Sequence, residues 1–353
     1  MDPALADLAE AGAKPVHLDR VTRVWLTGSR VSEATERDRL RLPRAASELL
    51  VEVESKLDGL ARVVSEHPSD EGDGARLVVE LRDGRQIESV LLPRDGVCIS
   101  TQVGCAVGCS FCMTGTLGLE RQLDTGEILA QVVLARRRQS VRRVVFMGMG
   151  EPSHNLPAVL EAVTVLTRQG NLRRKELVVS TVGDLRTFEA MAANPVRPAL
   201  ALSLHSLDRR LRESLLPRAP KLEPSELLEA ALAYAELAGC PLQIQWTLLE
   251  GVNDGEQELA RLIEGVRGRR AVVDYIPYNP VEAFEHRRTS RERTHQLTRA
   301  LHAEGILAKR RNSAGQDIDG GCGQLRARTQ TGTDVRRQPS GQKDAPKTSE
   351  ACT

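Results

Sequence analysis

The sequence predicts an α/β protein, and two observations support this fold class. Short apolar runs alternate with segments of helical pattern over most of the chain, and repeated strand–helix units of this kind give parallel strands with right-handed crossovers. The runs are apolar almost throughout, as expected of strands that are covered on both faces. Both an α/β barrel and an open α/β sheet fit. Of the 353 residues, 41% are hydrophobic and 27% are charged, which is typical of a globular protein with a substantial core.

The first ninety residues precede the repeated units. Residues 17–27 and 43–57 predict two short helices. Leu77–Leu81 and Gln86–Leu92 predict two strands of a hairpin, because Asp83-Gly84 between them is a common turn pair. We therefore expect a small accessory domain at the N-terminus, built from helices and a β-hairpin.

From Val97 onward the strand–helix units are regular. The predicted strands are Val144–Met147, Leu177–Ser180, Ala199–Leu204, Gln243–Leu249 and Val272–Ile276. The predicted helices are Gly126–Arg138, Leu156–Gln169, Pro224–Ala238, Gly255–Val266 and Arg291–Glu304. No stretch approaches the run of about 18 apolar residues that a membrane helix needs.

Three regions follow from this organisation: an accessory region over residues 1–90, a core over 91–326 and a tail over 327–353. The tail is polar and cannot bury enough apolar surface to fold, so we expect it to be disordered. The N-terminal segment is acidic and lacks the basic start and apolar block of a secretory signal. We therefore expect the protein to be cytoplasmic.

The overall charge and the aromatic content give no sign of a nucleic-acid partner. The net charge is +1, and Phe, Trp and Tyr together number only nine, so a broad platform for stacking single-stranded bases is not supported. The chain has 42 arginines and only 7 lysines. Guanidinium groups suit phosphates, but a codon bias would produce the same excess.

The strongest functional signal is the cysteine group Cys105-Ala-Val-Gly-Cys109-Ser-Phe-Cys112, which follows a predicted strand end. Strand-end loops carry the active sites of parallel barrels. Three thiolates at C-x3-C-x2-C spacing can hold three irons of a 4Fe–4S cluster and leave the fourth iron open for chemistry. The alternative is a zinc site completed by Cys98 or a histidine. The x3 spacing and Phe111 favour the cluster.

A second block, Val145-Phe146-Met147-Gly148-Met149-Gly150-Glu151-Pro152, ends the next predicted strand. Together with the cysteine group it resembles the radical S-adenosylmethionine (SAM) enzymes, in which a glycine-rich strand end receives the amino group of SAM. Glycine permits close backbone approach, and Glu151 offers an acceptor to an ammonium group. The resemblance implies a partial (β/α)6, TIM-like radical SAM barrel with SAM and a 4Fe–4S cluster bound to Cys105, Cys109 and Cys112.

Three further blocks resemble the RlmN/Cfr family of RNA adenine methyltransferases. They are Cys98-Ile-Ser-Thr-Gln-Val-Gly-Cys105, Gly118-Leu119-Glu120-Arg121-Gln122-Leu123 and Gly315-Gln316-Asp317-Ile318-Asp319-Gly320-Gly321-Cys322-Gly323-Gln324-Leu325. The resemblance extends from about Asp83 to Leu325. The chain departs from the family pattern at Gln316, where an aspartate is usual, and at Gly320-Gly321, where two alanines are usual.

The resemblance implies that a methyl group passes through a cysteine. Cys322 accepts a methyl group from one SAM, and a radical from a second SAM removes a hydrogen atom from it, so that the methyl carbon adds to the adenine ring. Glu88 is then the expected proton acceptor, although its position in a strand also fits an ordinary solvent-facing residue. Cys98 is expected to attack the sulfur of Cys322, which releases the RNA and forms a transient disulfide.

The same resemblance implies a set of SAM contacts at predicted strand ends. They are Gly150, Glu151, Ser180, Ser203, Leu204, His205 and Asn279. Val182 stands where the family has a second serine after Ser180. Taken alone, His205 is more typical of a packed core histidine. Because all these residues follow predicted strands, we expect one barrel mouth to gather them.

The expected function is methylation of adenosine C2 in 23S ribosomal RNA, with transfer RNA as a further substrate. Methylation at C8, as in the antibiotic-resistance branch of the family, is the nearest alternative. A non-catalytic iron–sulfur or zinc RNA-binding module and a radical SAM enzyme with a non-RNA substrate stay open. The expected partners are RNA and an electron donor such as flavodoxin, with no membrane contact, and we expect a monomer.

Overall fold

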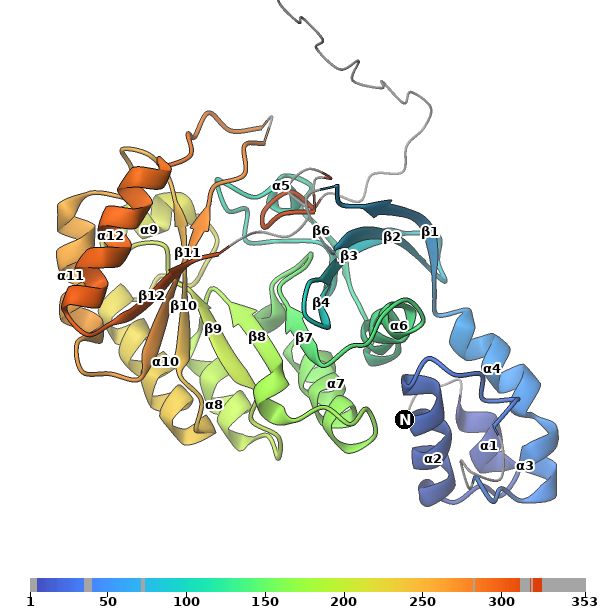
Figure 1. The fold of residues 1–353 in the computed structure, drawn as a ribbon. Helices are drawn as coiled ribbons and strands as arrows, with labels where there is room; N and C mark the ends of the chain where they lie inside the picture. The colour runs from blue at the N-terminus through green and yellow to red at the C-terminus, as the bar shows by residue number, and fades with distance from the viewer. Residues whose placement is uncertain are drawn as a thin grey trace, which may run out of the picture.

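The computed structural model describes residues 5–34, 40–70, 74–281, 283–311, 318 and 320–325. Within these residues one ten-stranded sheet runs through the molecule in the order β1-β2-β3-β4-β7-β8-β9-β10-β11-β12 (Figure 1). A separate pair, β5-β6, lies outside it. The predicted tail and the departure at Gln316 lie outside the described residues.

The strands and helices have the following bounds. The strands are β1 (Ala61–Pro68), β2 (Ala75–Leu81), β3 (Gln86–Leu92), β4 (Gly96–Ile99), β5 (Gln102–Gly104), β6 (Leu119–Gln122), β7 (Arg143–Phe146), β8 (Leu177–Thr181), β9 (Ala199–Ser203), β10 (Leu242–Leu248), β11 (Ala271–Pro277) and β12 (Leu307–Arg310). The α-helices are α1 (Ala6–Glu10), α2 (Pro15–Leu26), α3 (Arg44–Glu48), α4 (Leu50–Asp58), α5 (Met113–Thr116), α6 (Thr125–Arg136), α7 (Leu156–Arg168), α8 (Leu185–Ala193), α9 (Arg209–Leu215), α10 (Pro224–Ala238), α11 (Glu256–Val266) and α12 (Arg291–Ala303). Two 3-10 helices are η3 (Pro152–Asn155) and η4 (Arg174–Glu176).

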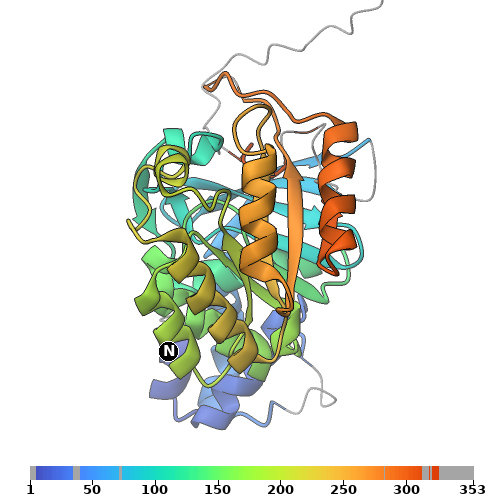
Figure 2. The ribbon, with the colours of Figure 1, turned by 90° about the vertical axis from the view of Figure 1, so that its left-hand side faces the viewer.

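The parallel part of the sheet confirms the predicted α/β fold. From β4 to β12 each described strand pairs in parallel with its neighbour in the sheet. Six strand–helix units follow one another, namely β4–α6, β7–α7, β8–α8, β9–α10, β10–α11 and β11–α12. The strand order is linear, so the barrel is open, and β12 extends its edge. The helices pack along the outer side of the curved sheet (Figures 1 and 2).

The N-terminal strands continue the same sheet in antiparallel order. β3 pairs with β2 on one side and with β4 on the other, so the sheet passes across the predicted boundary at residue 90. The division into three regions therefore stays a prediction. The helix predicted over residues 43–57 is two helices, α3 and α4, which meet at Leu49. The predicted turn at Asp83-Gly84 is present, since the Gly84 N–H donates to the Leu81 carbonyl.

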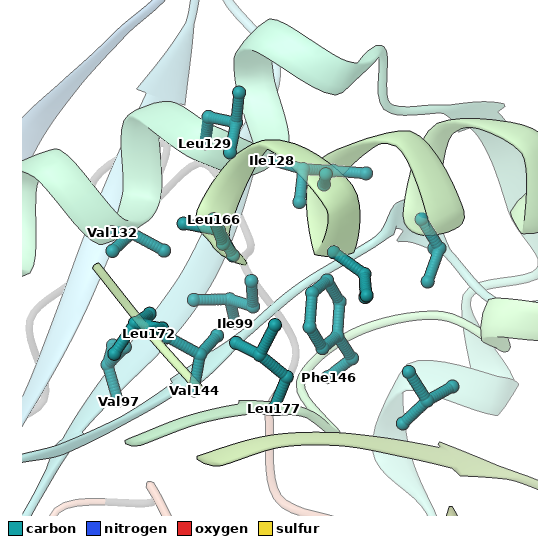
Figure 3. Packing of buried hydrophobic residues seen from close by; sticks show 14 of the residues in the cluster. Val97, Ile99, Ile128, Leu129, Val132, Val144, Phe146, Leu166, Leu172 and Leu177 are labelled. Carbon is teal, nitrogen blue, oxygen red and sulfur yellow. The ribbon is translucent and has the colours of Figure 1, made fainter. Parts of the chain in front are cut away.

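A continuous hydrophobic core fixes α6 and α7 on the sheet (Figure 3). Val97 and Ile99 of β4 and Phe146 of β7 are fully buried, as is Ile128 of α6. Burial of each such side chain contributes about 1.5–3 kcal/mol. The side chain of Asp124 caps α6 by accepting from the Glu127 N–H. This packing holds the strand ends in place beneath the loops described next.

Two features lie away from those strand ends. A cavity of about 430 Å³ opens between α2, α6 and α7, and apolar side chains line most of it together with the carboxylates of Asp19, Asp124 and Glu161. It contains none of the predicted site residues. In the part of the chain that the structure describes, no helix is both long and apolar enough to span a bilayer.

Candidate active site

The predicted site residues lie at the carboxyl ends of the parallel strands. Glu151 follows β7, Ser180 lies near the end of β8, Ser203 ends β9 and Asn279 follows β11. These ends point toward one edge of the sheet, and α5, which follows the three cysteines, lies on that side (Figure 1). Residues distant in the sequence therefore share one barrel mouth, as predicted for strand-end loops.

The three-cysteine loop is held by its own backbone. The Cys105 N–H donates to the Gly118 carbonyl at 2.8 Å, and the Cys112 N–H donates to the Cys109 carbonyl at 3.1 Å. Gly104, just before the loop, has a φ of +76°, and a Cβ there would lie 1.9 Å from the Gly118 carbonyl oxygen. Only glycine fits this close approach, so the entry into the loop is fixed by sequence.

Burial raises the pKa of all three thiols. That of Cys105 rises to about 12, and the charges of Cys112 and Glu151 add to the effect of burial. The pKa of Cys109 is raised by burial and then by the charges of Cys112 and Cys105. Three thiolates that oppose one another in this way need a positive partner, and bound metal keeps a coordinating thiol deprotonated.

The donor set of this loop bears on which metal group it suits. Three cysteines at C-x3-C-x2-C spacing on one short loop offer one thiolate to each of three irons of a 4Fe–4S cluster. The donor set fits such a cluster.

Glu151 is a buried carboxylate with a fixed orientation. The Thr181 hydroxyl and the Ser153 N–H donate to Oε1, and the Val182 N–H donates to Oε2 at 3.0 Å. Gly150 beside it has a φ of +103°, where glycine is favoured. Since a carboxylate has about four acceptor positions, Glu151 has room for one more donor such as an ammonium group.

Arg212 of α9 places a buried cation near this carboxylate. Its Nη2 donates to the Val182 carbonyl at 2.6 Å, and its Nε has no hydrogen-bond partner within the described residues. Burial lowers the pKa of Arg212 to about 10, while the charges of Cys109 and Glu151 favour its charged form. A buried donor without a partner indicates that a ligand completes the site, which fits an anionic group bound beside the cysteine loop.

His205 is a neutral, rigidly held imidazole. The Thr247 N–H donates to Nδ1 at 3.0 Å, so the ring proton lies on Nε2. The ring packs edge-on against Phe111 of the cysteine loop, with centroids 4.8 Å apart. Burial, and then the charge of Arg212, lowers the pKa of His205 to about 3. His205 is therefore packed as a core histidine and also lies against the cysteine loop.

The remaining predicted SAM contacts differ in their surroundings. The hydroxyls of Ser180 and Ser203 lie 3.4 Å apart on neighbouring strands. Leu204 is fully buried and belongs to the main hydrophobic core. The side-chain amide of Asn279 donates to the Cys322 carbonyl at 3.0 Å, and so ties the segment that carries Cys322 to the barrel mouth.

Arg311 lies beside both predicted catalytic cysteines. It donates to Asp274 Oδ2 at 2.9 Å and to Met147 Sδ at 3.1 Å, and it hydrogen-bonds to the Cys322 thiol. Burial raises the pKa of Cys98 to about 12, and the charge of Cys322 raises it further, while the Met147 N–H and the charge of Arg311 act in the opposite sense. The structure thus brings Cys98 and Cys322 together around one guanidinium.

Glu88 is buried in β3, with 1% of its surface exposed, so it is not a solvent-facing strand residue. Arg76 of β2 forms an ion pair with it. The Nε of Arg76 also donates to the Ile318 carbonyl at 2.6 Å. Arg76 thereby links Glu88 to the segment that leads to Cys322.

Sequence reasoning missed Arg76, Arg212 and Arg311. In a chain with 42 arginines no single one stands out by composition. The available signal was position, because Arg212 and Arg311 both come shortly after predicted or actual strands, where barrel active sites lie.

Known proteins are similar to this chain in sequence and in fold. Residues 99–263 match the model of the radical SAM superfamily. A probable RNA methyltransferase of Bordetella avium is 55% identical over 338 residues, which cover 94% of this chain and 95% of the relative. One of Pseudomonas aeruginosa is 55% identical over 337 residues, covering 95% and 97%. The crystal structure of a radical SAM methyltransferase from Sphaerobacter thermophilus is 34% identical, with a TM-score of 0.80, and the match covers 92% of this chain and 96% of that one.

Proposed function

Because this chain belongs to the family of radical SAM RNA methyltransferases, we propose that it methylates C2 of an adenosine in 23S ribosomal RNA, and also in transfer RNA, through an S-methylcysteine at Cys322. Family membership implies a 4Fe–4S cluster and SAM. In this proposal Cys105, Cys109 and Cys112 hold the cluster. The SAM contacts are Gly150, Glu151, Ser180, Ser203, Leu204, His205 and Asn279.

The observation that carries the proposal is that Arg311 is near enough to Cys98 and to Cys322 for its charge to act on both thiols. The segment that carries Cys322 is also joined to the cysteine loop, because the Met113 N–H donates to the Gly323 carbonyl at 2.7 Å. The C2 carbon of adenine has no nucleophilic lone pair, so it cannot take the methyl group of SAM by polar displacement. A protein carrier for the methyl group and a second thiol to release the product meet this need. A zinc-binding module, even one completed by Cys98, would need no methyl carrier at Cys322.

In this proposal each residue has its own step in the reaction. The Cys322 thiolate displaces the sulfonium sulfur of SAM from the methyl carbon, and Arg311 stabilises the thiolate before the transfer. Bound at this site, the cluster and a second SAM supply an electron and a hydrogen-abstracting radical, with a reductant such as flavodoxin as the source of the electron. After the methyl-derived carbon has joined adenine C2, the adduct returns one electron to the redox system that supplied it and Glu88 takes the ring proton, which leaves an aromatic ring joined to Cys322 by a thioether. The Cys98 thiolate then attacks the sulfur of Cys322. The bond from that sulfur to carbon breaks with its electron pair going to the carbon, this carbon takes a proton to become the methyl group, and a disulfide remains.

The decisive experiment compares single and double cysteine variants. Cys98→Ala should methylate Cys322 and join it to RNA, but cannot release the product, so a ribonuclease-sensitive upward gel shift is expected. Cys322→Ala and the double variant should give no shift. Cys240, a buried cysteine between α10 and β10, provides the matched control Cys240→Ala. Multiple turnover by Cys98→Ala would refute the mechanism.

Two measurements test the rest of the proposal. Anaerobic reconstitution should give about four irons and four sulfides per chain, and Cys105→Ala should lose the cluster. Formation of a one-zinc protein instead, when iron is in excess, would contradict it. Mass spectrometry of ribosomal and transfer RNA from a deletion strain should show loss of 2-methyladenosine, whereas loss of 8-methyladenosine would place the reaction at C8.

A further inference from the structure

Arg212 is a buried guanidinium to which the described part of the chain offers no carboxylate partner. Only 3% of its surface is exposed, and one of its donors, Nη2, is used by the Val182 carbonyl. Its Nε has no hydrogen-bond partner among the described residues. Burial of an unpaired charge is strongly unfavourable, so such a group is expected to meet an anion from outside the chain.

The position of Arg212 is fixed relative to the cysteine loop. α9, which carries it, is capped at its N-terminus by Asp208, whose side chain accepts from the Leu211 N–H at 2.9 Å. At the other end of the helix the Leu215 carbonyl accepts from the Ser110 N–H of the cysteine loop at 2.9 Å. Shortly beyond, the Arg218 N–H donates to the Val107 carbonyl of that loop at 3.2 Å. The helix and the cysteine loop therefore form one unit.

The main chain of Val182 hydrogen-bonds both to Arg212 and to Glu151. Its N–H donates to Glu151 Oε2 at 3.0 Å, and its carbonyl accepts from Arg212 at 2.6 Å. The two side chains are near enough for the charge of Glu151 to affect Arg212. Among the described residues, however, no ion pair joins Arg212 to Glu151. Val182 therefore holds a carboxylate and a guanidinium, and each of these groups can form a further hydrogen bond.

The methionine part of SAM carries an ammonium and a carboxylate on one carbon, which is the complementary pattern. We propose that Arg212 binds the carboxylate of SAM while Glu151 receives its ammonium. Arg212 is then a SAM-binding residue that orients the amino-acid end of the molecule on the cysteine loop. This inference rests on the SAM site proposed above and adds to it a second charged contact.

The test removes the carboxylate from the ligand and the guanidinium from the protein separately. Binding of SAM and of decarboxylated SAM is measured by anaerobic equilibrium dialysis with reconstituted wild type and with Arg212→Gln. Arg210→Gln, an exposed arginine on the same helix, is the matched control. Because decarboxylated SAM also loses any bond between its carboxylate and iron, the informative quantity is the change in the ratio of the two dissociation constants between proteins.

If Arg212 binds the carboxylate, Arg212→Gln should weaken SAM binding about 10- to 100-fold, as for loss of a charge-assisted hydrogen bond, and should change binding of decarboxylated SAM less than about 3-fold. Arg210→Gln should change neither. An equal loss for both ligands would overturn the contact and assign Arg212 to charge balance at the thiolates, with the proposed function intact. Failure of wild type to bind SAM would refute the proposed function itself.

Folding of the variants is controlled by iron content and by the visible absorption of the cluster. Arg212→Lys keeps the charge and loses the planar fork of donors. It should weaken SAM by a smaller factor than Arg212→Gln and again spare decarboxylated SAM. Wild-type discrimination between the two ligands in Arg212→Lys and Arg212→Gln alike would overturn the inference.

Discussion

The pKa of Cys98 leads to a quantitative prediction about which cysteine accepts the methyl group. Burial raises this pKa from 9.0 to about 12, and the neighbouring Cys322 contributes in the same sense. At pH 8 a thiol with a pKa near 12 is ionised in about one molecule in 10,000, against about one in 10 for a pKa of 9. Cys98 should therefore stay protonated and should not take the methyl group from SAM.

The expected reactivity of Cys98 follows from that ratio. Native protein has about a thousandfold less Cys98 thiolate than unfolded protein at pH 8. A more basic thiolate is also a better nucleophile, with a Brønsted coefficient of about 0.4–0.5. Over three pK units the intrinsic reactivity of the thiolate therefore rises by a factor of about 16 to 32, which offsets part of the loss in thiolate concentration. The net expectation is alkylation about 30- to 60-fold slower than in the unfolded chain, before any steric hindrance.

The assay is alkylation by iodoacetamide, followed at the Cys98 peptide by mass spectrometry in native protein and in protein unfolded in urea. The native rate should rise about tenfold per pH unit from pH 7 to 10. Cys322→Ala should lower the pKa of Cys98 and speed the reaction, and Arg311→Gln should raise the pKa and slow it, because these two charges act in opposite senses. A native rate that levels off below pH 9, or opposite effects of the two variants, would refute the reasoning.

Three further predictions concern stability and the strand ends. Gly150→Ala should cost about 1–3 kcal/mol in urea unfolding and abolish SAM binding, because φ is +103° there and a Cβ would lie 2.7 Å from the Gln102 side chain; retained binding would contradict this. The pKa of His205 is lowered by burial from 6.5 to about 3, so its contribution to stability is present above pH 6.5 and is lost as the pH falls, by about 2 kcal/mol at pH 5. His205→Gln should show a smaller fall in unfolding free energy from pH 7 to pH 5 than wild type. Asp124→Ala should cost about 1 kcal/mol in the same assay, since it removes the cap that accepts from Glu127, and an unchanged midpoint would argue against the cap.

Periodicity in the sequence was enough to predict the parallel part of the fold. The helix predicted over Pro224–Ala238 matches α10, because apolar spacing, an early proline and the C-terminal Gly239 all agree. The strand predicted over Gln86–Leu92 matches β3 for a similar reason, since a turn pair precedes it. β12 was not predicted, because its sequence Leu307-Ala308-Lys309-Arg310 lacks the apolar run of β7, which has the same length, and its place in the sheet is set by pairing with β11.

The site was predictable where residue type and spacing define the chemistry, and not where a contact depends on the fold. Cys98 and Cys322 were chosen from motifs, and the structure brings them close together. Glu88 was chosen by resemblance, against a reasonable expectation that it faces solvent. Its ion-pair partner is Arg76 on the adjacent strand, and the register of β2 and β3, which sets Glu88 opposite Val78 and so diagonal to Arg76, is a tertiary property.

The three buried or partly buried arginines of the site share one arrangement, which explains why lysine would not replace them. Arg76 uses Nη1 for Glu88 and Nε for a main-chain carbonyl. Arg311 contacts Cys322 while other donors bond to Asp274 and Met147, and Arg212 bonds to Val182 while its Nε has no partner among the described residues. In each case one donor of the rigid fork anchors the side chain, and another is available to an acid, a thiol or, as proposed for Arg212, a ligand. Because lysine carries its charge on a single flexible nitrogen, anchoring would compete with that second contact. The arginine excess, which composition alone left without meaning, thus has a structural use at these three positions.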